Sequence, residues 1–107
     1  MIYTLTLNPT IDRTMVFPRL QVGELNRASA SHTDLSGKGV NVSMAFRILG
    51  CESVTMGFMA GTYGQLLQAG LERQGFACDL LEVAGETRSN VTVIDAHAGI
   101  TTKLNEP

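Results

Sequence analysis

Segments typical of strands and of helices alternate along the first 83 residues, and this order limits the fold more than any other feature. Short runs rich in β-branched and aromatic residues are separated by longer segments whose apolar residues recur at helical spacing. Strands are expected over 2–7, 53–60 and 79–83, and helices over 39–49 and 61–75. Because this order is typical of a parallel sheet joined by crossover helices, the sequence predicts an α/β fold with a Rossmann-like core.

Glycines mark several boundaries of these elements. Gly50 follows the first helical segment as its C-terminal stop, and Gly75 ends the second. Gly57 lies inside a strand segment, where a missing side chain suggests close packing. Gly70 lies inside the second helix and costs about 1 kcal/mol relative to alanine. The leucines of that helix are expected to face one way: Leu66, Leu67 and Leu71.

Two regions interrupt the alternating order. Residues 14–34 read as two or three short, half-exposed strands, over 15–17, 20–25 and 27–34. Residues 90–94 and 100–104 read as a hairpin joined by 95–99. Such strands do not fit a parallel core, so we expect them to pair with each other as a separate, lid-like sheet. The predicted division is a core of 1–12 and 35–87 and lid strands within 13–34 and 88–105.

Composition narrows the class of protein. Apolar residues make up 44% of the 107 residues and charged residues 17%, which is typical of a globular domain. The net charge of −2 and the lack of a basic run argue against a nucleic-acid or anionic-membrane partner. No apolar stretch approaches the length of a membrane span, and residues 1–4 do not begin a signal peptide. A cytoplasmic location is the resulting expectation.

The cysteines and histidines do not suggest a metal or redox site. Cys51 and Cys78 are single and far apart in the sequence, which favours two reduced, partly buried thiols. His32 is expected in a strand and His97 in a turn, and neither has a partner at metal-ligand spacing. We therefore expect neither a metal site nor a catalytic cysteine.

The segment from Ser36 to Asn41 places two glycines and a cation where a helix begins. Free N–H groups at a helix start favour an anion, and Gly37 and Gly39 would let that anion approach closely. Lys38 adds a positive charge, and the Asn41 amide lies in the first turn. The pattern suits a phosphate or a polyhydroxyl compound, although a tight turn into a helix explains the glycines equally well.

Two nucleotide-binding motifs are excluded at this helix start. A Walker A loop needs Ser or Thr after Lys38, where Gly39 stands. The dinucleotide fingerprint needs a glycine at the position of Val42.

Three further polar residues are candidates for a binding site. Asp12 follows the first strand at the sheet edge where open α/β folds bind ligands, and its carboxylate could accept sugar hydroxyls. A turn cap or an ion pair with Arg13 is the alternative role for Asp12. Arg88 and Asn90 lie where the core passes into the hairpin, and an arginine there suits a phosphate or is simply a solvated charge.

Taken together, these motifs resemble the ribokinase-like (PfkB) carbohydrate kinases. The resemblance is carried by Thr6-Leu7-Asn8-Pro9-Thr10-Ile11-Asp12, the 36–43 segment, the strand end at 57–61 and Thr87-Arg88-Ser89-Asn90, which occur in the family's order. Within the family the chain is most similar to the N-terminal portion of 1-phosphofructokinases and tagatose-6-phosphate kinases. Ser36 departs from the pattern, because the family usually has glycine there.

The resemblance implies a function as well as a fold. It implies a ribokinase-like α/β core with a β-sheet lid that often forms a homodimer. It also implies that Asp12, Gly37, Lys38, Gly39 and Asn41 bind the acceptor sugar and that Arg88 and Asn90 approach its phosphate. The implied reaction transfers the γ-phosphate of ATP, with Mg²⁺, to a hydroxyl of a ketose phosphate.

The resemblance also implies a catalytic aspartate inside a Gly-Ala-Gly-Asp motif and an ATP site, and neither has a match up to Pro107. These 107 residues are therefore expected to be inactive alone, because phosphoryl transfer depends on positioning and electrostatic stabilisation. Two alternative functions stay open: a non-catalytic sugar-phosphate-binding or dimerisation module, and a kinase of an unphosphorylated sugar or nucleoside. An isolated piece of a doubly wound sheet is also expected to be marginally folded, oligomeric or held by a partner chain.

Overall fold

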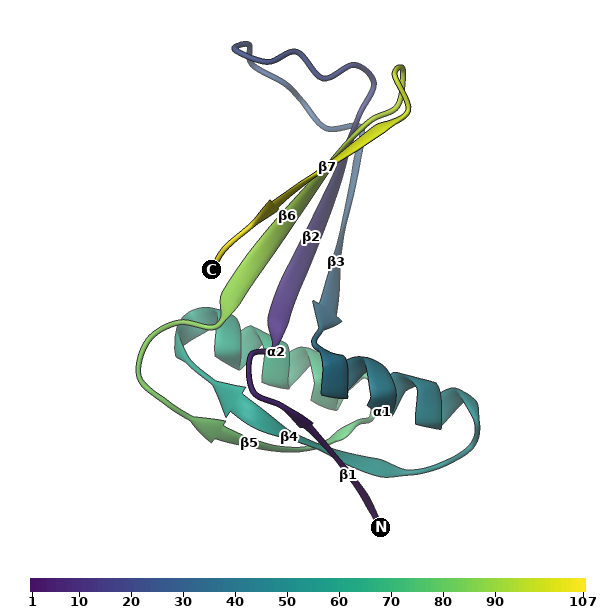
Figure 1. The fold of residues 1–107 in the computed structure, drawn as a ribbon, viewed down its shortest axis with the longest axis vertical. Coiled ribbons are helices and arrows are strands. Elements are labelled where there is room, and N and C mark those ends of the chain that lie inside the picture. The colour runs from purple at the N-terminus through teal and green to yellow at the C-terminus, as the bar shows by residue number, and fades with distance from the viewer. The chain divides into compact units, whose positions relative to one another are not determined.

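The structure, a computed structural model, describes residues 1–107 (Figure 1). The chain divides into two compact units. The first unit comprises Met1–Ile11 and Leu35–Arg88, and the second comprises Asp12–Asp34 and Ser89–Pro107. Neither helix is both long enough and apolar enough to cross a membrane.

A three-stranded parallel sheet forms the first unit, in the order β1 (Ile2–Thr6), β4 (Ser53–Met59), β5 (Ala77–Glu82). The helices α1 (Lys38–Ile48) and α2 (Gly61–Arg73) connect these strands and lie on the same face of the sheet (Figure 1). The predicted α/β class and the strand–helix order are confirmed. The strand expected over 79–83 begins two residues earlier, at Ala77.

The core of the first unit lies between this sheet and its helices. Leu67 and Leu71 of α2 are fully buried beside Val40 and Ile11. Leu66 is about half exposed, so the prediction that it shares the buried face was wrong. Leu66 lies only one residue before Leu67, about 100° around the helix, and therefore points away from the sheet.

Small residues bring α1 close to the sheet. A Cβ added at Gly39 would lie 2.7 Å from the backbone carbonyl of Leu5, so only glycine fits at this crossing. One turn later the buried Ser43 hydroxyl lies 2.6 Å from the Thr4 hydroxyl and accepts hydrogen bonds from Ser53 and Thr55. This contact through glycine and hydroxyl groups fixes the start of α1 relative to β1.

The remaining strands form a mixed four-stranded sheet in the order β3 (Ala30–Ser36), β2 (Thr10–Phe17), β6 (Arg88–Asp95), β7 (Ile100–Asn105). β6 and β7 are an antiparallel hairpin in which Asn90 pairs with Asn105. β2 lies beside β6, so the early and late strand regions do pair with each other, as predicted.

Residues 20–25 are not a strand, which corrects the prediction for this stretch. The Asn26 side chain closes a turn here: its carboxamide accepts from the Gln21 amide and donates to the carbonyls of Gln21 and Glu24. Gly23, with φ of 85°, supplies the left-handed backbone that this turn requires. The backbone N–H and C=O groups of this segment therefore form hydrogen bonds within the turn and do not pair with a strand of the sheet.

Both cysteines are free thiols, as expected. Cys51 is exposed, however, and not partly buried as predicted, because it follows the end of α1 at the surface. Cys78 is half-buried in β5, where burial and the neighbouring Glu72 raise the pKa of its thiol. His32 lies in β3 and His97 in the β6–β7 turn, as predicted.

Candidate functional site

Gly37 and Gly39 form the start of α1 against the carboxyl end of β1. Gly37 has φ of 140°, and a Cβ there would lie 2.5 Å from the Thr6 methyl group. Thr6 also accepts a hydrogen bond through its hydroxyl from the Val40 amide, at 3.0 Å. Both glycines therefore have a packing role, and this supports the tight-turn explanation for them without excluding a ligand.

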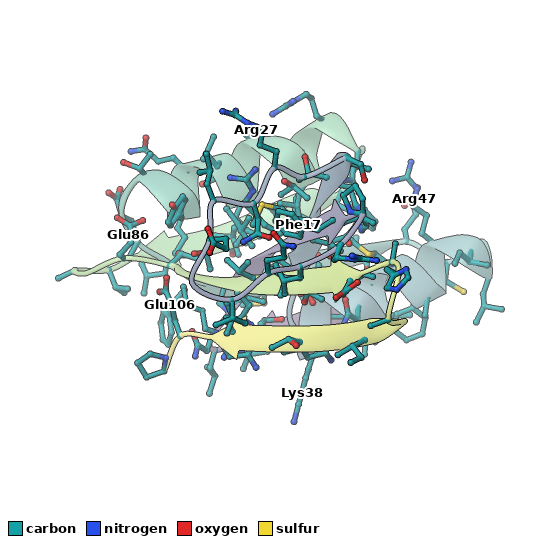
Figure 2. All side chains as sticks on the ribbon, turned by 90° about the horizontal axis from the view of Figure 1, so that it is seen from above. Phe17, Arg27, Lys38, Arg47, Glu86 and Glu106 are labelled. Carbon is teal, nitrogen blue, oxygen red and sulfur yellow. The ribbon has the colours of Figure 1, made fainter.

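No side chain at the N-cap position, Gly37, caps the start of α1. The first-turn amides of Lys38 and Gly39 have no partner inside the helix, as at any helix start. Lys38 and Asn41 are three residues apart and exposed, so they share one side of the first turn. Lys38 extends outward into solvent (Figure 2). The start of α1 thus combines partial positive charge, a lysine and an amide side chain.

The start of α2 is built differently. Its N-cap, Ala60, has no capping side chain. The Glu86 carboxylate lies there instead: it accepts the Tyr63 amide at 2.7 Å and occupies the place where a Cβ of Gly61 would be. The buried Thr87 hydroxyl accepts the Ala60 amide at 3.0 Å. An acidic side chain of the chain itself therefore occupies the positive end of α2.

Arg88 follows directly, as the first residue of β6. Its backbone carbonyl accepts the Thr10 hydroxyl at 3.3 Å. The Nε–H of Arg88 is buried and has no hydrogen-bond partner. A buried donor without a partner costs about 1–3 kcal/mol, so this guanidinium can gain from an anionic ligand.

Asp12 and Asn90 lie in the second unit. Asp12 is half-buried within β2 and not in the turn after the first strand, because β2 already begins at Thr10. The Asn90 carboxamide oxygen accepts the Glu106 amide at 3.2 Å, so Asn90 secures the segment that follows β7.

Sequence reasoning missed Thr6, Glu86 and Thr87, which hold the two helix starts in place. A signal for them was present. Gly37 and Ala60 precede the helices where Ser, Thr, Asp or Asn is usual, which indicates that caps come from elsewhere in the chain. Which residues supply those caps depends on strand register, which local patterns do not reveal.

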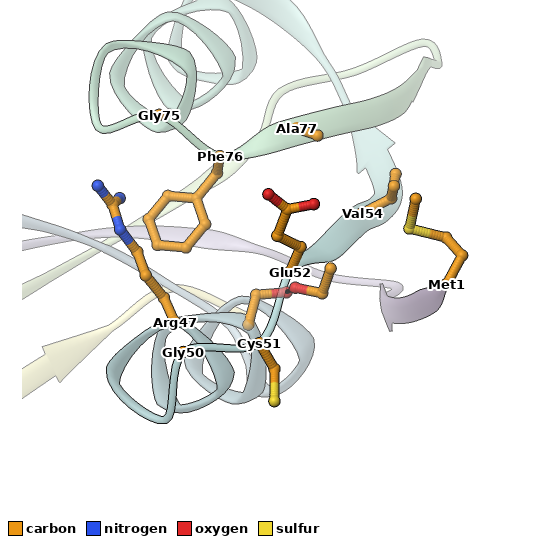
Figure 3. Close-up of a pocket in the computed structure, with 11 residues that line it drawn as sticks. Met1, Arg47, Gly50, Cys51, Glu52, Val54, Gly75, Phe76 and Ala77 are labelled. Atoms are coloured by element: carbon orange, nitrogen blue, oxygen red, sulfur yellow. Dashed lines mark hydrogen bonds between the residues drawn. The ribbon is translucent and has the colours of Figure 1, made fainter.

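A cavity of about 460 Å³ lies at the end of the parallel sheet where the strands begin, away from the two helix starts (Figure 3). Arg47, Cys51, Glu52 and Phe76 are among its lining residues, and the Arg47 guanidinium stacks 4.9 Å from the centre of the Phe76 ring. The cavity is next to the amino ends of β4 and β5, whereas the residues described above follow carboxyl ends. Since open α/β sheets bind ligands at their carboxyl ends, the cavity is not the candidate site. No group of three or more His, Cys, Asp or Glu residues could hold a metal ion.

Proteins of known function resemble the whole chain. The 1-phosphofructokinase of Xanthomonas campestris is 35% identical over 104 residues, which are 97% of this chain and 33% of that protein. The tagatose-6-phosphate kinase of Staphylococcus epidermidis is 30% identical over 99% of this chain and 34% of its own length. The chain is homologous to PfkB-type, ribokinase-like carbohydrate kinases. No protein-family model matches it.

Solved structures of PfkB-type kinases agree with this fold. A putative phosphofructokinase from Staphylococcus aureus has a TM-score of 0.91 at 36% identity and matches all of this chain with 34% of its own. The Escherichia coli phosphofructokinase-2, solved with fructose 6-phosphate, has a TM-score of 0.88 at 27% identity, over 99% of this chain and 35% of its own. The chain corresponds to the N-terminal portion of these kinases and spans about a third of their length.

Proposed function

We propose that the chain is the acceptor-sugar portion of an ATP-dependent sugar-phosphate kinase of the 1-phosphofructokinase or tagatose-6-phosphate kinase type. The observation that carries this proposal is the start of α1, where Gly37-Lys38-Gly39 follows a strand end and no acidic side chain caps the helix. In the complete kinase, a hydroxyl of a ketose phosphate would receive the γ-phosphate of ATP.

The roles of the individual residues follow from their charge and surroundings. The helix start, Lys38 and the buried Nε–H of Arg88 supply positive charge for the phosphate already on the sugar. Asn41 offers an amide on the exposed side of the first turn. From the resemblance we further propose that Asp12 binds the sugar hydroxyls and that Asn90 approaches the phosphate of the substrate.

No catalytic step is assigned to residues 1–107. The described residues form no acidic cluster for Mg²⁺, and the family's catalytic aspartate belongs to a Gly-Ala-Gly-Asp motif without a counterpart here. We assign ATP, Mg²⁺ and the proton transfer to polypeptide that corresponds to the other two-thirds of the relatives. The 107 residues alone should bind a sugar phosphate without turning over ATP.

Calorimetry with the 107-residue chain tests the proposal. Fructose 1-phosphate, tagatose 6-phosphate or fructose 6-phosphate should bind more tightly than unphosphorylated fructose. Arg88→Ala should weaken the preferred ligand about 10- to 100-fold, which corresponds to roughly 1.5–3 kcal/mol for a charge-assisted contact. Arg73→Ala, at the exposed end of α2, is the matched control and should change nothing.

Two outcomes would refute the proposed substrate class. Binding of fructose as tightly as its phosphates, unchanged in Arg88→Ala, would favour a kinase of an unphosphorylated sugar. Binding of none of the phosphates, together with no phosphorylation of them by the complete protein, would remove the sugar-phosphate assignment altogether.

We also propose that the four-stranded sheet forms a homodimer, as the similarity implies for the family's lid. β7 is exposed along its whole length and keeps one unpaired edge. Light scattering should give twice the mass of the chain, and Leu104→Lys should return it to a monomer. A monomer in the unsubstituted chain at high concentration would contradict this interface.

A further inference from the structure

The segment Glu86-Thr87-Arg88 connects the start of α2 to the start of β6. Glu86 and Thr87 accept main-chain amides at the start of α2, and Arg88 follows as the first residue of β6. Glu86 is exposed, whereas Thr87 is only 6% exposed. Thr87 is therefore the member of this segment whose hydrogen bonds are protected from water.

Thr87 and Ala60 are joined by a reciprocal pair of hydrogen bonds. The Ala60 amide donates to the Thr87 hydroxyl at 3.0 Å, and the Thr87 amide donates to the Ala60 carbonyl at 2.9 Å. Ala60 is the N-cap of α2, and its carbonyl also accepts the Gly64 amide. A Cβ at Gly64 would lie 3.0 Å from the Thr87 hydroxyl oxygen, so this glycine leaves room for the contact. The main chain and the side chain of Thr87 are thus both fixed to the junction of β4 and α2.

This double contact limits the directions that the Arg88 side chain can take. The peptide bond between Thr87 and Arg88 is planar, so a fixed Thr87 leaves few rotations by which the chain could reorient Arg88. Next to Arg88, the buried Thr10 hydroxyl donates to its carbonyl at 3.3 Å. The Arg88 backbone is therefore held by the protein itself, independently of any ligand.

The Arg88 side chain is the group that needs this support. Its Nε–H is buried without a hydrogen-bond partner. Arginine binds phosphate through two parallel N–H···O bonds, and the planar guanidinium fixes their geometry. A binding group of this kind has to be held within about 0.5 Å of its productive position. How firmly residue 87 is anchored thus decides how well Arg88 can bind an anion.

We propose that Thr87 is a positioning residue, which holds Arg88 in the direction needed to bind the phosphate of the acceptor sugar. The inference rests on the proposed function, because the anion concerned is the phosphate already on the ketose. Its own hydroxyl is occupied by the Ala60 amide, so Thr87 acts through Arg88. A neutral, buried side chain then contributes to the selectivity for phosphorylated sugars.

Hydrogen exchange of the Arg88 Nε–H in the ligand-free chain tests the positioning. Thr87→Val keeps the shape of the side chain and removes the acceptor of the Ala60 amide, whereas Thr87→Ser keeps the hydroxyl. Thr55→Val is the matched control, because it removes a fully buried hydroxyl that donates to Ser43 in the same unit. By NMR, exchange should be more than about tenfold faster in Thr87→Val and less than about twofold faster in the other two variants.

A double-mutant cycle tests the consequence for binding. Its probe is whichever of fructose 1-phosphate, tagatose 6-phosphate and fructose 6-phosphate binds most tightly by calorimetry. Thr87→Val should weaken this ligand about 5- to 10-fold, but less than about twofold in the Arg88→Ala background, because both residues act through one contact. Thr87→Ser and Thr55→Val should retain the affinity.

Unchanged Arg88 exchange in Thr87→Val, or equally fast exchange in Thr55→Val, would overturn the proposal. An equal loss of affinity from Thr87→Val with and without the Arg88 side chain would also overturn it, since Thr87 would then act only on the fold. Failure of the proposed function looks different: Arg88→Ala would leave binding unchanged while Thr87→Val still released the Arg88 Nε–H. That result would keep Thr87 as the anchor of Arg88 and remove its role toward a sugar phosphate. If Thr87→Val does not fold, Thr87→Ala supplies the same comparison.

Discussion

The two helix starts of the first unit are capped by groups of different charge. Both follow a strand, and neither has a capping side chain at its own N-cap residue. At α1 the distant group that binds a first-turn amide is the neutral Thr6 hydroxyl, and at α2 it is the Glu86 carboxylate. The helix dipole is thus already neutralised at α2 and still available to an external anion at α1.

The helices also differ in why they contain glycine. Gly39 of α1 faces the Leu5 backbone, which cannot move aside without disturbing β1. Gly70 of α2 faces the end of the Leu35 side chain, which can rotate. The start of α1 is therefore fixed by backbone packing, and this holds Lys38, a proposed binding residue, in place.

The largest effect is expected from Gly39→Ala. The new methyl group would lie 2.7 Å from the Leu5 carbonyl, so α1 must move and the free energy of unfolding should fall by about 3 kcal/mol. Gly70→Ala is the matched control and should change it by less than about 1 kcal/mol, because higher helix propensity offsets the shift of Leu35. Urea unfolding measures both, and equal losses would remove the distinction between the helices.

Thr6→Val should have the next largest effect. It keeps the methyl group that packs on Gly37 but leaves the buried Val40 amide without its acceptor. The expected loss is about 1.5 kcal/mol, with faster hydrogen exchange at the Val40 amide. Thr102→Val, at an exposed position of β7, should be neutral. An unchanged Val40 exchange rate would show that Thr6 does not cap α1.

Glu86→Gln tests the charge difference directly. Removing the carboxylate from the start of α2 should cost about 1 kcal/mol, because the amide side chain caps less well and leaves the dipole unopposed. Titration with inorganic phosphate should shift the Lys38 and Gly39 amide signals in the unsubstituted chain and the Tyr63 signal only in Glu86→Gln. A Tyr63 shift in the unsubstituted chain would contradict the idea that Glu86 occupies the anion position.

The smallest effect concerns the carboxylate of Asp95, in the β6–β7 turn. The hydrogen bond from the Ala98 amide lowers the pKa of this carboxyl below its ordinary value. Because the pKa of Asp95 is lower in the folded chain, its ionised carboxylate stabilises the fold at pH values above the ordinary carboxyl range. This stabilisation is lost as the pH falls through the folded pKa. An NMR titration should show the Ala98 amide signal move only at acid pH, and in Asp95→Asn it should not titrate.

Much of the fold could be predicted because it depends on local patterns. The spacing of apolar residues indicates strands over 2–7 and 53–60 and a helix over 39–49, and glycines mark the ends of elements. Residues 20–25 were misread because a side chain five residues from Gln21, that of Asn26, takes the backbone hydrogen bonds that a strand would use. Apolar composition alone does not show such a local turn.

The candidate site was less accessible to sequence reasoning. Gly37, Lys38 and Gly39 were recognisable because a helix start has a short signature. Glu86 was not, since its partner Tyr63 is 23 residues away and depends on how β4 and β5 pair. The place of Asp12 inside β2 was also decided by sheet pairing and not by the preceding Asn-Pro turn.

The sequence by itself determined the α/β class, the helix start at residues 36–41 and the similarity to PfkB-type kinases, because these depend on residues close together in the chain. Tertiary structure alone decided which helix start is neutralised, which glycine packs against backbone, and which sheet face stays open. These features arise when strands far apart in sequence adopt one register and right-handed crossovers place both helices on one side.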